Sequence, residues 1–430
     1  MLRSLAISLL LSLCFGGTVL YGNDSLKNSP DEVEGEYIIH LNEFLKEPVI
    51  KDIADDLGVE VKYVFKSAPA ILVKNLERED DQTLDEVAVN HEVIAGIDPN
   101  KYLYINEIPN DLGFKRQYAH KKMQSQEAWD YATGNREVVV AVIDTGINYN
   151  HPDIQPNYWY NQGELGTDSQ GNDKRTNGVD DDGNGYVDDF RGWDFADGDN
   201  DPMDELGHGT HCAGIIGAVG NNSEGVVGVN WQVSLVGLKF ISKRKGTVAA
   251  AIEAIEYAVT MGFDLTSNSW GGDLKKENPK TIELMRAAVA SAGKEGQLFV
   301  SAAGNNGKST ETNPIIPGAF DLDHIVTVGS TDENDKLSVF SNYGPISVDL
   351  MAPGSRILST YLRRSYKSLS GTSMAAPYVA GAAALLMSVH GKNLSTDRIK
   401  RKLMESVDKI PELREKSVTG GRLNLLKLMQ

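Results

Sequence analysis

LSGTSMAAPYVAGAAALL, residues 369–386, is an apolar stretch that opens on a glycine and two hydroxyl side chains. From Met374 onward its Ala- and Leu-rich composition predicts a buried helix, in which Pro377 is tolerated because it would fall in the first turn. Thr372 and Ser373 have two interpretations. They could cap the helix by accepting hydrogen bonds from free N–H groups, or Ser373 could be a nucleophile placed where the helix dipole favours negative charge. A nucleophilic serine requires a histidine base and a carboxylate that orients this base.

The composition is that of a large, acidic, globular protein. The chain has 430 residues, with 42 Lys and Arg against 60 Asp and Glu, and a formal net charge of −18. This length is enough for a large core and a second, smaller domain. The acidic balance argues against nucleic-acid binding, which relies on basic patches. Much of the acid lies in Asp-rich loops between residues 180 and 204, which favours cation binding.

Residues 1–22 have the pattern of a signal peptide. Arg3 precedes an apolar run from Leu5 to Phe15 that is too short to span a membrane. We therefore expect a secreted protein; a periplasmic protein, or one anchored by a lipid on Cys14, is the alternative. Apart from Cys14 the chain has one cysteine, Cys212, so we expect no disulfide within the mature chain.

Residues 34–106 are predicted to form a small separate domain. The expected strands are 36–41, 59–65, 70–74 and one that ends near 104, and the expected helices are 46–58 and 79–91. This βαββαβ pattern is typical of a ferredoxin-like α+β fold. The turn-forming residues 106–113 then predict a linker.

Residues 107–430 are predicted to form a larger α/β domain. The expected strands are 138–143, 233–240, 264–269, 297–302 and 325–329, and helical patterns at 247–261 and 280–293 lie between them. Alternating strands and helices predict a mostly parallel sheet. In such sheets, functional residues gather at the carboxyl ends of the strands.

Two further segments supply the partners that Ser373 would need. In AVIDTG, residues 141–146, Asp144 directly follows a buried strand; in GHGTHCAG, residues 207–214, His208 stands between glycines, with His211 as a competitor. Each residue alone has a structural explanation, such as a turn cap for Asp144. Together, in the order Asp, His, Ser, they indicate nucleophilic catalysis. The absence of a G-x-S-x-G motif around Ser373 argues against the α/β-hydrolase arrangement.

These segments resemble those of the subtilisin-like serine proteases, most nearly of the thermitase type. The resemblance covers roughly residues 107–430 and includes VIDTGINYNHPDI, HGTHCAG, SNSWGG, SAAGNNG, VDLMAPGS, LSGTSMAAPYVAG and GGRLN. It implies a three-layer α/β fold with a mostly parallel central sheet. Residues 34–106 resemble the family's inhibitory propeptide more loosely, by pattern and position.

The resemblance also implies roles for individual residues. Ser373 would attack the peptide carbonyl, His208 would accept its proton, and Asp144 would orient His208. Asn305 would donate to the oxyanion, although beside Gly304 it could also be a turn residue. The segment Ser269, Trp270 and Gly271 would line the pocket for the substrate residue before the cleaved bond; the alternative for Trp270 is a surface or core aromatic.

Calcium is the cofactor that the resemblance implies. A tight site would use side chains of Asp111, Asp153 and Asn222 and carbonyls of Val219, Glu224 and Val226. Asp197, Asp199 and Asp201 resemble a weaker second site. A third candidate lies in an insertion beyond the thermitase pattern, where Asp180, Asp182, Asn184, Tyr186 and Asp188 fit an EF-hand-like loop. Arg191 stands where that loop would need a bidentate Glu, so an acidic turn without a cation is the alternative.

The sequence thus predicts a secreted, calcium-stabilised, monomeric serine endopeptidase of protein or peptide substrates. It would be made as a zymogen that its own propeptide inhibits and that cuts itself between residues 104 and 113. Two rivals stay open: a catalytically silent binding protein of the same fold, and a protease of narrow specificity whose acidic loops select basic substrates.

Overall fold

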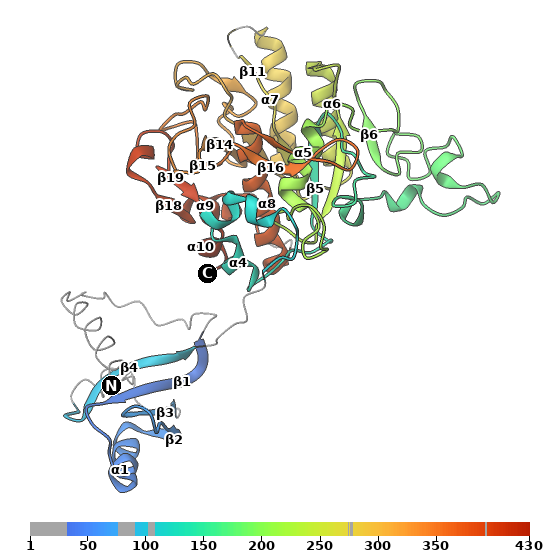
Figure 1. Cartoon of the computed structure of the whole chain (residues 1–430). Coiled ribbons are helices and arrows are strands. Elements are labelled where there is room, and N and C mark those ends of the chain that lie inside the picture. The colour runs from blue at the N-terminus through green and yellow to red at the C-terminus, as the bar shows by residue number, and fades with distance from the viewer. Residues whose placement is uncertain (1–31, 76–90, 102–107, 274, 276–277, 392–393) are drawn as a thin grey trace. The chain divides into compact units, whose positions relative to one another are not determined.

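The computed structural model describes residues 32–75, 91–101, 108–273, 275, 278–391 and 394–430. The chain divides into two compact units, residues 1–103 and residues 104–430, and Figure 1 shows the elements of each. The predicted signal peptide and the second helix predicted for the small domain lie outside the described residues. Residues 108–113 of the predicted linker form neither helix nor strand.

The first unit is a four-stranded antiparallel sheet with one described helix. Its elements are β1 (Glu32–Leu41), α1 (Glu47–Leu57), β2 (Val59–Val64), β3 (Ala70–Asn75) and β4 (Ile94–Lys101). The strand order is β2-β3-β1-β4, and every pairing is antiparallel, as expected for the ferredoxin-like pattern. Ile53 and Leu57 of α1 are buried in one cluster with Ile39, Ile71 and Val73 of the sheet.

The second unit is built on a nine-stranded sheet of order β18-β19-β15-β14-β12-β10-β5-β7-β6. All pairings are parallel except β18 with β19. This confirms the predicted α/β class and a mostly parallel sheet. The strands of this sheet are β5 (Val139–Asp144), β6 (Gly192–Asp194), β7 (Ser234–Lys239), β10 (Leu265–Asn268), β12 (Leu298–Ala302), β14 (Ile325–Thr331), β15 (Leu350–Pro353), β18 (Val407–Lys409) and β19 (Gly421–Leu423).

Helices and short hairpins complete this unit. The α-helices are α3 (Tyr118–Lys122), α4 (Ser125–Trp129), α5 (His208–Gly217), α6 (Val248–Thr260), α7 (Pro279–Lys294), α8 (Thr372–His390), α9 (Thr396–Glu405) and α10 (Leu425–Met429). The two-stranded pairs are β8 (Ile241–Ser242) with β9 (Lys245–Gly246), β11 (Gly272–Asp273) with β13 (Ile315–Ile316), and β16 (Ile357–Thr360) with β17 (Tyr366–Leu369). Single 3₁₀ turns are η1 (Phe114–Arg116), η2 (Gln155–Asn157), η3 (Gln162–Glu164), η4 (Lys174–Thr176) and η7 (Pro411–Leu413).

The sheet is covered on both faces, so the unit has three layers. Val140 and Val142 of β5 pack in one core with residues of α5 and α8. Ala141 and Ile143, which point the other way, pack in a second core with α6 and α7. Because successive residues of a strand face opposite sides, this division shows why β5 reads as a continuous apolar run.

Helix α8 begins two residues earlier than predicted. It starts at Thr372, so Pro377 lies inside the helix and not in its first turn, and the expectation for Pro377 is wrong. A proline lacks the N–H that would bond to the carbonyl four residues back, which here is that of Ser373. That carbonyl instead accepts hydrogen bonds from Ser269 Oγ at 2.9 Å and Cys212 Sγ at 3.3 Å. These tertiary contacts offset the missing helical bond.

Among the described residues, α8 is the one helix long and apolar enough to span a membrane, and it is mostly buried inside the unit. Its close packing depends on Gly381. A β-carbon at Gly381 would lie 2.8 Å from Val229 Cβ, and Val229 is fully buried.

Replacing Gly381 by Ala should therefore overpack this contact and destabilise the large unit by about 1–3 kcal/mol. The measurement is urea unfolding of Gly381→Ala in a Ser373→Ala background, which removes the predicted nucleophile. Val229→Ala makes room for the new methyl group, so the double variant should lose less stability than the sum of the two single losses. Additive losses would contradict the proposed contact.

Candidate active site

Asp144 and His208 meet where β5 ends and α5 begins. Asp144 is the last residue of β5 and His208 the first residue of α5. His208 Nδ1 lies 2.7 Å from Asp144 Oδ1 and 2.9 Å from Oδ2. Asp144 is fully buried, whereas the His208 side chain is 34% exposed. The carboxylate can therefore hold the ring while its other nitrogen faces a reactant.

The residues next to this pair allow and fix the contact. A β-carbon at Gly209 would lie 2.1 Å from the Gly146 carbonyl oxygen, so glycine is required for α5 to come this close. The Gly209 N–H donates to Thr145 Oγ1 at 2.9 Å. Thr145 N–H in turn donates to Asp144 Oδ1 at 2.7 Å, which fixes the orientation of the carboxylate.

Ser373 lies in the first turn of α8, beside these residues. Its Oγ donates to the Ser269 carbonyl at 3.0 Å, so the hydroxyl proton would have to turn away from Ser269 to reach the predicted base, His208. Cys212 lies between Ser373 and the Asp144–His208 pair. Its Sγ is 3.3 Å from the Ser373 carbonyl oxygen and within 4.8 Å of ligand atoms of Asp144 and His208.

Asn305 follows the end of β12 and contacts the start of α8. Its Oδ1 accepts hydrogen bonds from Thr372 N at 2.8 Å and Thr372 Oγ1 at 3.0 Å. Thr372 Oγ1 also accepts from Gly304 N. With Oδ1 held in this way, the amide Nδ2 of the exposed Asn305 is left to donate to another group. This is the arrangement needed to stabilise a negative oxygen at Ser373.

The sequence analysis did not identify Asp204, which holds the start of α5 and the loop after β5 together. This buried carboxylate accepts from Thr145 Oγ1 at 2.9 Å, from Thr210 Oγ1 at 2.7 Å and from the N–H groups of Gly207 and Thr210. It thereby caps α5 and connects it to the loop after β5. An aspartate four residues before His208, at a helix start, was a usable signal.

The charges around His208 favour its protonated form. Burial lowers the pKa of His208, but the Asp144 charge and hydrogen bond raise it, Asp204 adds to this, and the net pKa lies above 6.5. His211 is buried and bonds to the Ile357 and Lys367 carbonyls, and burial lowers its pKa to about 4. His211 is therefore neutral where His208 titrates and is held away from a catalytic role.

Cys212 is not a competing nucleophile in this arrangement. Its side chain is fully buried, and burial raises the pKa of the thiol well above its usual value. The thiolate is the reactive form of cysteine, so a buried neutral thiol is unreactive.

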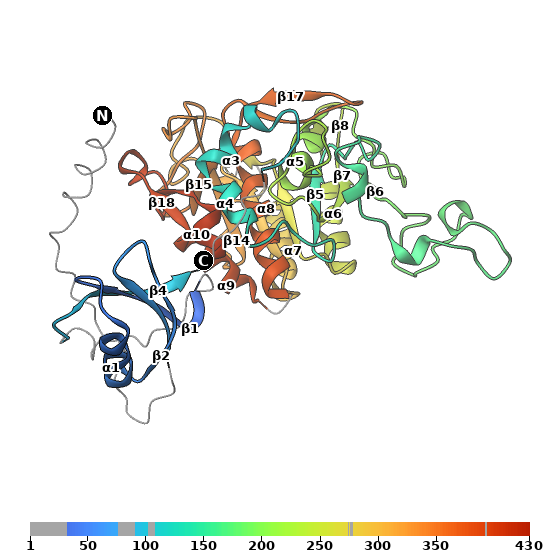
Figure 2. The same cartoon turned by 60° about the horizontal axis from the view of Figure 1, so that its bottom comes forward.

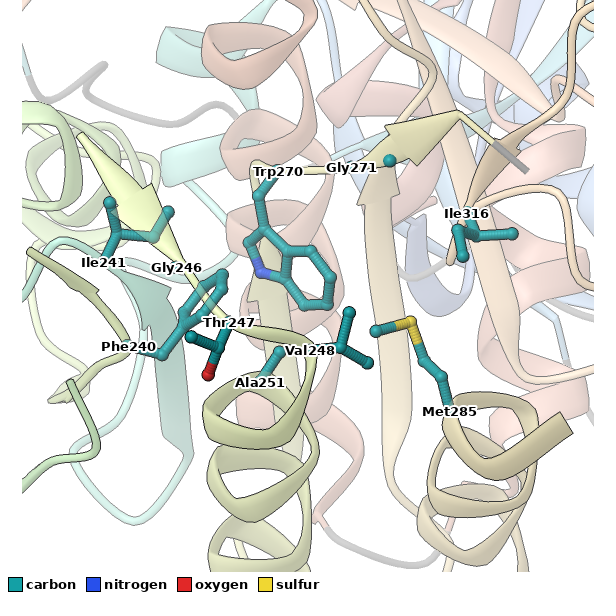
Figure 3. Close-up of a pocket in the computed structure, with 11 residues that line it drawn as sticks. Phe240, Ile241, Gly246, Thr247, Val248, Ala251, Trp270, Gly271, Met285 and Ile316 are labelled. Carbon is teal, nitrogen blue, oxygen red and sulfur yellow. The ribbon is translucent and has the colours of Figure 1, made fainter. Parts of the chain in front are cut away.

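Ser269 and Trp270 follow β10 and lead away from Ser373. Trp270 packs edge-on against Phe240, with ring centroids 4.9 Å apart, and forms part of the wall of a hollow of about 220 Å³ (Figure 3). The other walls are mainly apolar and come from the β8–β9 hairpin, α6, α7, β13 and the segment that leads into β11: Ile241, Gly246, Thr247, Val248, Ala251, Gly271, Gly272, Met285 and Ile316.

The structure brings together several predicted ligands of the tight cation site. Asp153 is fully buried and accepts from Asn222 Nδ2 at 2.7 Å and Val226 N at 2.9 Å. Asp111 Oδ2 accepts from Asn221 N, while Asp111 Oδ1 is buried with no partner among the described residues. Burial, together with the Asp153 charge, raises the pKa of Asp111. An orphaned carboxylate oxygen beside a second carboxylate fits a hard cation. The predicted carbonyl ligands, of Val219, Glu224 and Val226, belong to the same loop.

The second predicted site is not gathered in this way. Asp197 lies 3.8 Å from Lys239 Nζ, and Asp201 accepts from the Tyr149 hydroxyl at 2.7 Å. Among the described residues, the carboxylates of Asp197, Asp199 and Asp201 are not one of the groups of three whose ligand atoms converge.

The third predicted loop is partly gathered. Carboxylate oxygens of Asp180 and Asp182 converge, and Asn184 Nδ2 contacts Asp182 and Asp189. Asp188 instead accepts a hydrogen bond from Gly178 N.

A pH profile tests the electrostatics of His208. As the predicted base, His208 has to be neutral, so labelling of Ser373 by a serine-directed phosphonate should slow as pH falls through the His208 pKa, which is raised above that of a free histidine. Asp204→Asn removes one nearby anion and should move the midpoint to lower pH. Asp321→Asn, a matched change at an exposed position, should leave it in place. An unchanged midpoint in folded Asp204→Asn would contradict the role of Asp204.

Comparisons with known proteins agree with this geometry. Residues 135–423 match the subtilase family of peptidases. Thermitase from Thermoactinomyces vulgaris is 37% identical over 329 residues, which are 75% of this chain and 99% of that protein. A thermophilic serine proteinase from a Bacillus species is 32% identical over 384 residues, 88% of this chain and 83% of that one. A solved protease structure from Pseudoalteromonas arctica superposes with a TM-score of 0.59 at 27% identity, covering 75% of this chain and 99% of that one. The chain therefore belongs to the subtilase family and is a serine endopeptidase.

Proposed function

We propose that this chain cleaves peptide bonds through Ser373, His208 and Asp144, with Asn305 in the oxyanion site. The bidentate contact of His208 Nδ1 with the buried Asp144 is the observation that carries the proposal. It leaves His208 Nε2 to accept the Ser373 proton and later to deliver it to the leaving amine. Asp144 keeps the ring in the required tautomer and stabilises its cation.

Negative charge on the carbonyl oxygen is stabilised by donors already in place. Asn305 Nδ2 and the Ser373 N–H are the two donors, because Asn305 Oδ1 is occupied by Thr372. The positive end of the α8 dipole acts in the same direction. Donors that need no rearrangement during the reaction make the largest contribution to such catalysis.

The substrate is an extended segment of a protein or peptide. It pairs with Ser269, Trp270 and Gly271 as an added strand, through backbone hydrogen bonds. The Ser269 end of this segment lies at Ser373, and the hollow beneath Trp270 takes an apolar side chain of the bound peptide. The narrow-specificity alternative differs only in which sequences bind here.

Residues 34–106 act as an inhibitory propeptide in this proposal. The enzyme removes them by cutting between residues 104 and 113. Residues 1–22 direct export, and the mature protease is secreted; retention in the periplasm or through a lipid on Cys14 is the alternative. The ferredoxin-like sheet of the first unit supports a domain that folds on its own core.

Intact mass after expression with calcium tests self-processing. The wild type should lose an N-terminal fragment that ends between residues 104 and 113, whereas Ser373→Ala should stay whole, because it lacks the nucleophile. Thr372→Ala is a useful comparison, since it weakens the support of Asn305 and should slow processing without abolishing it. If wild type and Ser373→Ala both stay whole and folded, the silent binding protein is the better description.

Calcium stabilises the enzyme at the loop of Asp111, Asp153 and Asn222. The residues present fit the ion because every donor is an oxygen and one of them, Asp111 Oδ1, is buried without a partner. A bound calcium would neutralise two carboxylates that otherwise repel each other.

Calcium removal should therefore lower the melting temperature of the Ser373→Ala protein. Ligand at 100 times its Kd stabilises the folded state by about 2.7 kcal/mol. Asp153→Asn should lose most of the increment due to this site, while Asp321→Asn should keep it. Differential scanning calorimetry with and without chelator measures the increment. Equal increments in Asp153→Asn and in its parent would argue against this site.

A further inference from the structure

A long insertion leaves the large unit beside β6 and returns to it. We call residues 162–189 the arm; it contains η3 and η4 and extends away from the rest of the unit (Figures 1 and 2). At its base, Asn161 N donates to the Phe190 carbonyl at 3.0 Å. The returning end of the arm is also bonded to the body, because Asn200 Nδ2 donates to the Asp188 carbonyl at 2.9 Å and the Tyr257 hydroxyl of α6 donates to Asp189.

Glu164, in η3 at the base of the arm, is buried with half of its carboxylate unpaired. Its exposed fraction is 0%. Oε1 accepts from Asp181 N at 2.7 Å, but Oε2 is buried with no partner among the described residues. An ionised carboxylate in such a position is destabilising unless a cation or donors compensate it.

The orphaned oxygen belongs to a convergent set of acids. Carboxylate oxygens of Glu164, Asp180 and Asp182 lie within 4.8 Å of one another. Backbone N–H groups of Gly183 and Gly185 hold Asp180, and Asn161 Nδ2 holds Asp182 at 2.8 Å. The three side chains are thus oriented by their neighbours and not merely adjacent on the surface.

The nearby basic side chains are engaged elsewhere. Lys174 Nζ lies 3.7 Å from Asp181 and donates to the Gly163 carbonyl. Arg175 pairs with Asp173, and the Arg191 guanidinium stacks on Tyr149 and Phe190 at 4.3 Å. Within the described part of the chain, no ion pair to a basic group compensates Glu164, Asp180 or Asp182.

We propose that Glu164, Asp180 and Asp182 bind a calcium ion that closes the base of the arm. Residues 180–185 match the D-x-D-x-N-G start of a calcium loop, and Glu164 supplies the carboxylate that the loop lacks at Arg191. The missing ligand thus comes from 16 residues before the loop and not from its end. Asp188, the ligand expected from the sequence, bonds instead to Gly178 N.

The chemistry of the ligands favours calcium. Calcium accepts all-protein oxygen sites of flexible geometry, whereas magnesium usually keeps several of its waters. The three ligands are all carboxylates, which suits a hard cation. Next to them, Asp189 is held by Asn161 and by the Tyr257 hydroxyl of α6. An ion on Glu164, Asp180 and Asp182 would therefore join the outgoing end of the arm to its returning end, which is already bonded to the body through Asp189.

Calcium titration of the full-length Ser373→Ala protein, stripped with chelator and dialysed, tests the proposal by calorimetry. Glu164→Gln should bind one calcium fewer and keep the site of Asp153, while Asp153→Asn should lose the other ion and keep this one. Glu253→Gln, an exposed change of the same kind on α6, should bind as the parent does. Because the host cannot cleave, the result is independent of the proposed mechanism at Ser373.

Trypsin gives a second measurement, since Lys174 and Arg175 lie within the arm. With calcium at about 100 times its Kd, cleavage there should slow about 100-fold in the parent, if cleavage follows local opening of the arm. Glu164→Gln should show no protection by calcium. Without calcium this variant should be at least as stable as the parent, because it carries one repelling charge fewer.

Asp182→Asn repeats the test if Glu164→Gln fails to fold. Calcium numbers and protection equal to those of the parent in either folded variant would overturn the proposal.

Discussion

The close approach of the first turn of α5 to the end of β5 is the constraint on which the site depends. Gly209 packs against the Gly146 carbonyl so tightly that no side chain fits between them. Only at this distance can His208 reach both oxygens of Asp144. Thr145 and Asp204 then connect the two elements by hydrogen bonds. The orientation of His208 thus follows from how a helix packs on a strand end.

Helix α8 shows a related use of backbone chemistry. Pro377 removes one helical hydrogen bond and leaves the Ser373 carbonyl free for Ser269 and Cys212. Ser373 is thereby bonded to the segment after β10 and to α5. Asn305, from the end of β12, bonds to the residue before it. Three other elements therefore converge on the first turn of α8.

Buried carboxylates in this protein are stabilised in two different ways. Asp204 is surrounded by hydroxyl and N–H donors, which stabilise its charge without an ion. Asp111 and Glu164 each retain a buried oxygen without a donor among the described residues, and each lies near other carboxylates. An uncompensated buried charge is strongly unfavourable. This difference therefore supports the proposal that Asp111 and Glu164 hold cations, whereas Asp204 needs none.

The sequence by itself determined the α/β class, the four strands and first helix of the small domain, the main strands and the family, because apolar periodicity and long motifs are local properties. It also placed Asp144 and Ser373 at element ends. The start of α8 was missed, because the tertiary bonds to the Ser373 carbonyl that allow Pro377 inside the helix cannot be read locally. Glu164 was missed for the same reason, because it acts on a different loop. Asp204 stands near the start of α5, which is a local signal, but its bond to Thr145 joins residues far apart in the chain. Only the tertiary structure decided these, since it alone determines which buried oxygens find a partner.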